Sequence, residues 1–464
     1  MVDVTSRIDS VRRNAVAILV AGCFFMENLD GTIVITAAPK IARDLGVASA
    51  AVAVTVTAFL LTVAVLIPAS GWLTDRFGLR RVFSVAIAVF TLASLLCALS
   101  TTLPMLVGMR VLQGIGGALM VPVGRLAVLR VTPRSGIIRA IAILVWPGLI
   151  APVIAPFLGG ILTTYASWHW IFLINVPLGV VAFVVSLRVV QNVELPAANS
   201  LDVVGLVSVV TGLGALVWGS SLVTKDGIDV PALLVAVVVG VVATAFAVRH
   251  LLRTAAPLLD LRVFRFESFR TANVGGSVYR ATISAVPFLL PLLFQDAFGW
   301  SAVNAGAAVL TLFLGNVGIK PATTWMLRTF GFRAVLVASN AIGIACMVAM
   351  GFLTTAVPVL LIVVLLIVSG AARSTGFTAY STITFADIDD DDMTAANTLN
   401  ATLQQVATGF GVAIGGMMLA AGFALGPGLV PYRIAFLAIA AVTVFPLVEA
   451  LLLSRHTGRQ LTEA

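Results

Sequence analysis

The chain has 464 residues, of which 60% are hydrophobic and only 10% are charged, and its net charge is +8. Soluble globular proteins carry roughly a quarter of their residues as charged types, so this composition excludes a soluble enzyme or binding domain. The basic residues lie in short segments between long apolar stretches, which argues against a nucleic-acid partner and indicates the lipid bilayer instead.

A membrane span needs about 20 mostly apolar residues, and the sequence predicts fourteen of them. They cover residues 14–36, 48–72, 82–101, 104–127, 139–164, 169–189, 202–222, 230–250, 270–295, 302–326, 333–354, 357–381, 395–422 and 432–453. An even number puts both termini on one side. Most Lys and Arg lie in segments on the same side of the membrane as the N-terminus. Because basic residues favour cytoplasmic loops, we expect both termini in the cytoplasm.

The first predicted span carries two acidic residues, Glu27 and Asp30. Residues three apart share a helix face, and two carboxylates that close in a low dielectric do not readily both carry charge. One of them can then hold a proton, which a proton carrier needs. Arg110 in the fourth span lies at a similar depth and is expected to pair with Asp30. The alternative is that both carboxylates sit hydrated near the outer interface.

The loop after the second span combines basic residues with spaced small and acidic ones. Its glycines predict a sharp turn and a close approach of helix ends, and its aspartate predicts a helix cap or an ion pair. An ordinary basic inner loop would explain only the arginines. The residues are Gly71, Asp75, Arg76, Gly78, Arg80 and Arg81.

This loop resembles the signature between spans 2 and 3 of the major facilitator superfamily of secondary transporters, although Leu79 stands where a basic residue is common. Leu29–Val34 and Trp168–Pro177 resemble its fourteen-span drug:proton antiporter branch, and the chain as a whole resembles the MdtD and HsrA group. Arg110–Gly117 resembles the R-x-x-Q-G-x-G motif. The resemblance implies an all-α fold of two six-helix bundles plus two inserted helices, with Arg110 acting in proton coupling.

The fifth span resembles the antiporter motif of the same branch. The matching residues are Pro152, Pro156, Gly159 and Gly160. The motif usually reads Gly-Pro twice, and here Ala151 and Ala155 replace the glycines. Alanine still permits close helix packing.

Two short segments recur at nearly equal offsets and predict an internal repeat. Phe77–Arg80 returns as Phe330–Arg333, and Gly159-Gly160 returns as Gly415-Gly416. The repeat divides the chain into a six-span bundle at 1–190, a linker and inserted pair at 191–261, and a second six-span bundle with a cytoplasmic tail at 262–464.

Three basic residues fall inside spans of the second half: Arg280, Lys320 and Arg373. No acidic residue of those spans is placed to neutralise them. Ionisable residues inside a membrane usually face a cavity or a partner, so we expect these three, with Gln113 of the fourth span, to line the substrate cavity. Snorkelling to lipid phosphates is the alternative for Lys320 and Arg373.

The predicted function is proton-coupled export of amphipathic small molecules by alternating access, without a cofactor and driven by the proton motive force. The alternative is a proton symporter or facilitator for an anionic metabolite. An intramembrane enzyme is less favoured, because the catalytic motifs of metalloproteases and serine hydrolases are missing from the sequence. A scaffold is also less favoured, because it would not need so many charges inside its spans. The acidic run Asp389–Asp392 lacks the pattern of a calcium loop, so no metal site is predicted. We expect a monomer in a bacterial cytoplasmic membrane, with substrate, protons and lipid as its partners.

Overall fold

The computed structural model describes residues 2–131, 137–191, 201–224, 227–228, 230–254, 257–384, 388 and 392–453. These residues are helical throughout apart from turns and one short hairpin, β1 (Val223–Thr224) and β2 (Gly227–Ile228). The helical segments are α1 (Val2–Leu45), η1 (Ser49–Val52), α2 (Ala53–Leu66), α3 (Ala69–Phe77), α4 (Leu79–Ala98), α5 (Leu103–Val131), α6 (Ile137–Tyr165), α7 (Trp170–Leu173), α8 (Asn175–Val189), α9 (Val203–Ser221), α10 (Val230–Arg253), η3 (Leu261–Arg265), α11 (Glu267–Leu292), the π-turn η4 (Leu293–Ala297), α12 (Ala302–Gly318), α13 (Lys320–Gly351), α14 (Val359–Ile383), α15 (Met393–Leu425) and α16 (Val430–Leu452).

Every apolar stretch predicted from the sequence lies on one of these helices or on consecutive ones. Within the described residues, twelve helices are long and apolar enough to cross a membrane. Two shorter apolar stretches, Ile150–Tyr165 and Val203–Leu216, lie within α6 and α9. The all-helical membrane fold is therefore confirmed, whereas the count of fourteen crossings stays a prediction.

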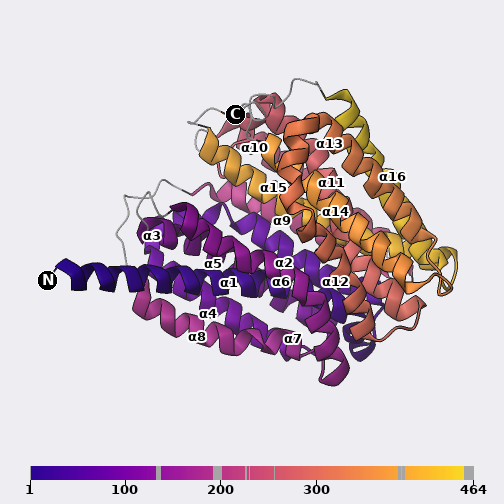
Figure 1. The fold of residues 1–464 in the computed structure, drawn as a ribbon, viewed down its shortest axis with the longest axis horizontal. Helices are drawn as coiled ribbons and strands as arrows, with labels where there is room; N and C mark the ends of the chain where they lie inside the picture. Colours follow the sequence, from indigo (N-terminus) through magenta and orange to yellow (C-terminus); the bar gives the residue numbers. More distant parts are fainter. Residues whose placement is uncertain are drawn as a thin grey trace.

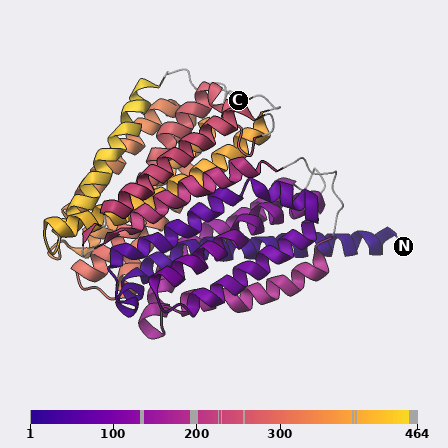
Figure 2. The same cartoon turned by 180° about the vertical axis from the view of Figure 1, so that it is seen from behind.

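The helices form two groups, α1–α8 and α11–α16, which are the indigo-to-magenta and the orange-to-yellow parts of Figure 1. They diverge toward the side on which α1 begins and α16 ends, and Figure 2 shows the same arrangement from behind. The groups meet through α6 against α12 and α2 against α15. Thr36 and Thr57 make hydrogen bonds across this junction, to Gln295 and Gly409. Thr36 lies in the part of α1 far from its start, so the halves touch at the opposite ends of their helices.

The pair α9 and α10 pack against each other, and α9 also contacts α2 and α15. The pair therefore lies along the line where the two groups meet. Asp202 links the start of α9 to the end of α10. Its Oδ1 accepts a hydrogen bond from Gly205 N at 2.8 Å and lies 2.7 Å from His250 Nε2, and its Oδ2 accepts one from Leu258 N at 3.1 Å. The first of these bonds caps the N-terminus of α9.

The two segments Phe77–Arg80 and Phe330–Arg333 contain matching turns in the backbone. Gly78 has φ of 86° between α3 and α4, and Gly331 has φ of 74° at the kink of α13. An edge-to-face pair precedes each glycine: Trp72 with Phe77 at 6.2 Å, and Trp325 with Phe330 at 5.6 Å. Both halves therefore build the same tight turn from the same residue types.

Candidate functional site

The carboxylate of Asp30 lies at the centre of a buried polar cluster inside the first group of helices. It pairs with Arg110 of α5, and its Oδ1 accepts hydrogen bonds from Gln113 Nε2 at 2.8 Å and Asn175 Nδ2 at 2.7 Å. The side chains of Asp30 and Arg110 are both fully buried. The predicted Asp30–Arg110 pair is confirmed, and the alternative of a hydrated Asp30 at the interface is wrong.

The guanidinium of Arg110 is held on several sides. Its Nε donates to the Thr55 carbonyl oxygen at 3.2 Å, its Nη1 donates to Gln113 Oε1 at 2.6 Å, and its carbon lies 4.2 Å from the centre of the Phe59 ring. A buried charge of this kind is stable only when it is paired and hydrogen-bonded. Protonation of Asp30 would remove the charge that pairs with Arg110, so one proton changes the whole cluster.

Gln113 was expected in the substrate cavity, but it lies in this cluster, where it also donates to Ser94 Oγ at 2.8 Å. The spacing held the signal, because Gln113 follows Arg110 by three residues and shares its helix face. Sequence reasoning assigned no role to Asn175. Its signal was an amide within the otherwise apolar segment Trp170–Pro177, since polar groups inside a membrane usually have a partner.

Glu27 lies one turn before Asp30 on α1 and faces Gly117 of α5. A Cβ added to Gly117 would lie 3.6 Å from the Glu27 carboxyl carbon. Its Oε2 is buried and has no hydrogen-bond partner among the described residues. The two acidic residues therefore differ: Asp30 is fully paired, whereas the Glu27 oxygen is not.

The antiporter-motif residues lie on α6 where the two groups meet. A Cβ at Gly159 would come within 3.0 Å of Ile33 in α1, and one at Gly160 within 2.5 Å of the Ala302 carbonyl oxygen in α12. From the other side, a Cβ at Gly306 would meet the Pro156 carbonyl oxygen at 2.2 Å. Pro152 lies one turn earlier in the same helix. The two adjacent glycines thus allow α6 to touch its own group and the opposite one at once.

The repeated glycines occupy the equivalent contact in the second half. A Cβ at Gly415 would lie 3.2 Å from Ala285 in α11, and one at Gly416 would lie 2.8 Å from Ala53 in α2. The pair α15–α2 therefore mirrors the pair α6–α12, which explains why the glycine pair recurs in the sequence.

The loop after α2 forms the short helix α3, and Gly78 makes the turn into α4. Arg76 and Arg81 are exposed and Arg80 is partly buried. The side chain of Asp75 lies outside the described residues. The expected close approach at Gly71 is wrong for this conformation, because a Cβ there would meet nothing within 4 Å.

These two glycines give a matched test. We expect Gly78→Ala to destabilise the protein by about 1–3 kcal/mol, because its backbone conformation disfavours any side chain. Gly71→Ala, in open helical surroundings, should be neutral or stabilising by about 0.5–1 kcal/mol. Thermal unfolding in detergent measures both. Equal melting temperatures for the two variants would contradict this assignment of the turn.

The three cations of the second half converge on α14. Arg280 lies 4.0 Å above the Phe377 ring and donates from Nη2 to Gln404 Oε1 at 2.9 Å. Lys320 Nζ donates to Thr378 Oγ1 at 2.9 Å, and the buried Nε and Nη1 of Arg373 have no partner within the described part of the chain. None of the three pairs with a carboxylate among the described residues.

The acidic run is described only at its last residue. Asp392 pairs with Arg265 of η3, whereas Asp389, Asp390 and Asp391 lie outside the described residues. The one described member therefore serves as an ion-pair partner between η3 and the start of α15.

Residues 20–274 match the family model described as the Major Facilitator Superfamily. The chain belongs to this superfamily. It is also 38% identical over 403 residues to MdtD of Escherichia coli O6:H1, a protein whose name assigns it to multidrug resistance; the match covers 86% of this chain and 85% of MdtD. The resemblance to the MdtD group predicted from the sequence is confirmed.

Solved structures of the superfamily share the fold at much lower identity. The nucleoside transporter NupG superposes with a TM-score of 0.66 at 13% identity, covering 95% of this chain and 98% of NupG. A mutant of the peptide transporter POT gives 0.70 at 13%, covering 96% and 95%. This superfamily consists of transporters that use ion gradients and need no cofactor, so the chain is a transporter and not an enzyme.

Proposed function

We propose that this transporter exports amphipathic small molecules in exchange for protons by alternating access. The observation that carries the proposal is the fully buried Asp30 carboxylate held by Arg110, Gln113 and Asn175. The multidrug-resistance name of MdtD, a relative over most of the chain, supports the export direction.

We propose fourteen crossings, with both termini in the cytoplasm of a bacterial cell, and a monomer in the cytoplasmic membrane. The domain limits 1–190, 191–261 and 262–464 complete this arrangement. The loop basicity supports the orientation, and α1 begins on the side where α16 ends. The halves then touch at their outer ends and diverge toward the cytoplasm.

In the proposed cycle Asp30 takes a proton from outside and releases it inside, and Arg110 controls how readily it does so. Glu27 is a second acceptor beside it. Protonation frees Arg110 from its counter-charge and favours a different arrangement of α1, α5 and α8. Coupling requires only that proton and substrate bind the two conformations with different free energies.

Two further elements serve the conformational change. The loop after α2 holds the cytoplasmic ends of the two groups of helices together when the site is open to the outside. Its residues are Gly71, Asp75, Arg76, Gly78, Arg80 and Arg81. The motif with Pro152, Pro156, Gly159 and Gly160 closes the outer ends. Arg280, Lys320 and Arg373 face the substrate path.

Proton flux in proteoliposomes tests the proposal. Adding an amphipathic substrate on one side should move protons toward that side, as antiport requires. Proton movement with the substrate would indicate a symporter, and substrate flux without any proton flux would remove the coupling role of Asp30.

We expect the unpaired cations to set the charge preference of transport. An anion at about 4 Å from Arg280 gains a few kcal/mol at an effective dielectric of about 20, and a cation loses as much. Anionic or zwitterionic amphiphiles should therefore be better substrates than dications. Arg280→Gln should lower the transport of a monoanionic amphiphile by roughly tenfold or more in an uptake assay.

Arg433→Gln is the matched control, because Arg433 also lies over a phenylalanine ring, at 5.0 Å from Phe352, but is exposed at the start of α16. It should leave anion transport unchanged. Robust export of a dication that Arg280→Gln does not alter would contradict the charge preference.

A further inference from the structure

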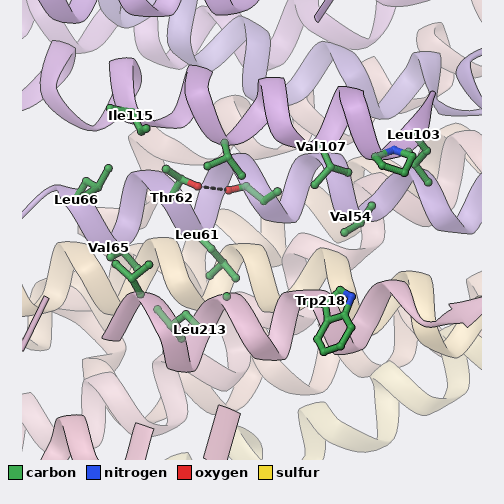
Figure 3. Close-up of a pocket in the computed structure, with 15 residues that line it drawn as sticks. Val54, Leu61, Thr62, Val65, Leu66, Leu103, Val107, Ile115, Leu213 and Trp218 are labelled. Atoms are coloured by element: carbon green, nitrogen blue, oxygen red, sulfur yellow. Dashed lines mark hydrogen bonds between the residues drawn. The ribbon is translucent and has the colours of Figure 1, made fainter. Parts of the chain in front are cut away.

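A long apolar groove lies between the first group of helices and the inserted helix α9. It has a volume of about 720 Å³ and is lined by α2, α5 and α9 (Figure 3). Among the described residues that line it, only Thr62 carries a hydroxyl, which donates to the Ala58 carbonyl oxygen at 2.7 Å. The groove therefore offers hydrocarbon contacts and selects a hydrocarbon ligand.

The groove runs parallel to the helices. On α2 its lining extends from Val54 to Leu66, and on α5 from Leu103 to Ile115. Each stretch is about 18 Å long at 1.5 Å per residue. One leaflet of a bilayer contributes about 15 Å of hydrocarbon. The length therefore matches a single extended acyl chain.

The position of the groove also matches one leaflet. Val54, Leu103 and Trp218 lie together at one end of it, and Ile115 and Leu66 lie at the other (Figure 3). Leu103 begins α5 and Trp218 lies near the end of α9, so under the proposed orientation this end faces the outer surface. Trp218 is 47% exposed, as expected for an aromatic residue at a membrane interface.

We propose that this groove binds one acyl chain of an outer-leaflet phospholipid, which fills the space between α9 and the first bundle. Because none of the described lining residues is charged, we expect the site not to distinguish the phospholipid headgroups. In the groove, the acyl chain also contacts the α2 residues that face α15. These are Val54, Ala58 and Leu61, which pack with Val406 and Phe410. The lipid is thus part of the surface along which the two halves move.

Gly214 provides the test, because it lines the groove and a Cβ there meets nothing within 4 Å. Gly214→Leu should place a side chain in the groove from a position where the added Cβ has open space. Gly22→Leu in α1 is the matched control, since that exposed glycine also has open space but lies outside the groove. Native mass spectrometry of the protein purified in detergent, with added phosphatidylethanolamine or phosphatidylglycerol, counts the bound lipids.

The wild type and Gly22→Leu should keep a single phospholipid that resists delipidation, and Gly214→Leu should lose it. Val111→Phe, which narrows the groove from α5, should also lose it and guards against a folding defect in the first variant. Equal lipid retention in all four proteins would overturn the proposal. If retention is equal and Gly214→Leu instead raises the KM for an exported amphiphile, the groove holds substrate and not lipid. The measurement of lipid retention does not depend on proton coupling.

Discussion

Asp30→Asn should abolish proton-driven export. Exchange driven by a substrate gradient, which needs no proton movement, should persist. The substitution removes the one carboxylate of the buried cluster, which is the group that can take up a proton. It also leaves Arg110 without its counter-charge, and breaking a buried pair in this way costs about 3–5 kcal/mol. An asparagine NH₂ would moreover face a donor in either orientation, because Gln113 and Asn175 donate to Oδ1 and Arg110 donates to Oδ2. The variant should therefore be both uncoupled and less stable, unlike an isosteric change at an exposed site.

Stability and coupling are separated by a second substitution. Asp30→Asn with Arg110→Gln should regain stability, because no buried charge is left unpaired, but should stay uncoupled. Thermal unfolding and proton flux in proteoliposomes give the two readouts. Glu27→Gln alone should retain most of the coupling. If Asp30→Asn transports protons normally and Glu27→Gln does not, the proton site is Glu27.

Gly160→Val should hold the outer ends of the two halves apart and stop transport. A Cβ at this position would lie 2.5 Å from the Ala302 carbonyl oxygen, whereas ordinary contacts are 3.4–4 Å. The helices α6 and α12 would have to separate by about 1 Å or more, because neither backbone can yield. Spin labels at Tyr165 and Asn304, both exposed near this junction, should report longer distances.

Gly108→Val is the control, because it has the same loss of helix propensity in open space on α5. It should leave both the distance distribution and transport unchanged. Gly416→Val should resemble Gly160→Val, since it blocks the equivalent contact with Ala53. Normal transport by Gly160→Val would show that this close contact is not needed in the cycle.

The sequence predicted those features that depend on distance along a helix. Counting residues from the loops placed Asp30 and Arg110 at one depth, and they are paired. The spacing of Gly78 and Gly331 revealed equivalent turns, because both need a positive φ.

Features that depend on how helices rotate against each other were not predicted. Gln113 was expected to line the substrate cavity, and the structure places it beside Asp30, since composition does not show which face of a buried helix meets a cavity. The groove beside α9 depends on how far α9 stands from α2, and that distance follows from packing across three helices. Asn175 became part of the cluster only through the fold, 145 residues from Asp30.

The proposed preference for anions, carried by the cations on α11, α13 and α14, would also determine how the membrane potential acts on transport. Exporting a monoanion against one proton moves two positive charges inward, whereas exporting a monocation against one proton moves none. With the cell interior negative, each charge contributes about 2.3 kcal/mol per 100 mV, so anion export gains about 5 kcal/mol per 100 mV from the electrical gradient. A cavity that prefers anions would thus let this transporter keep working when the pH gradient has collapsed.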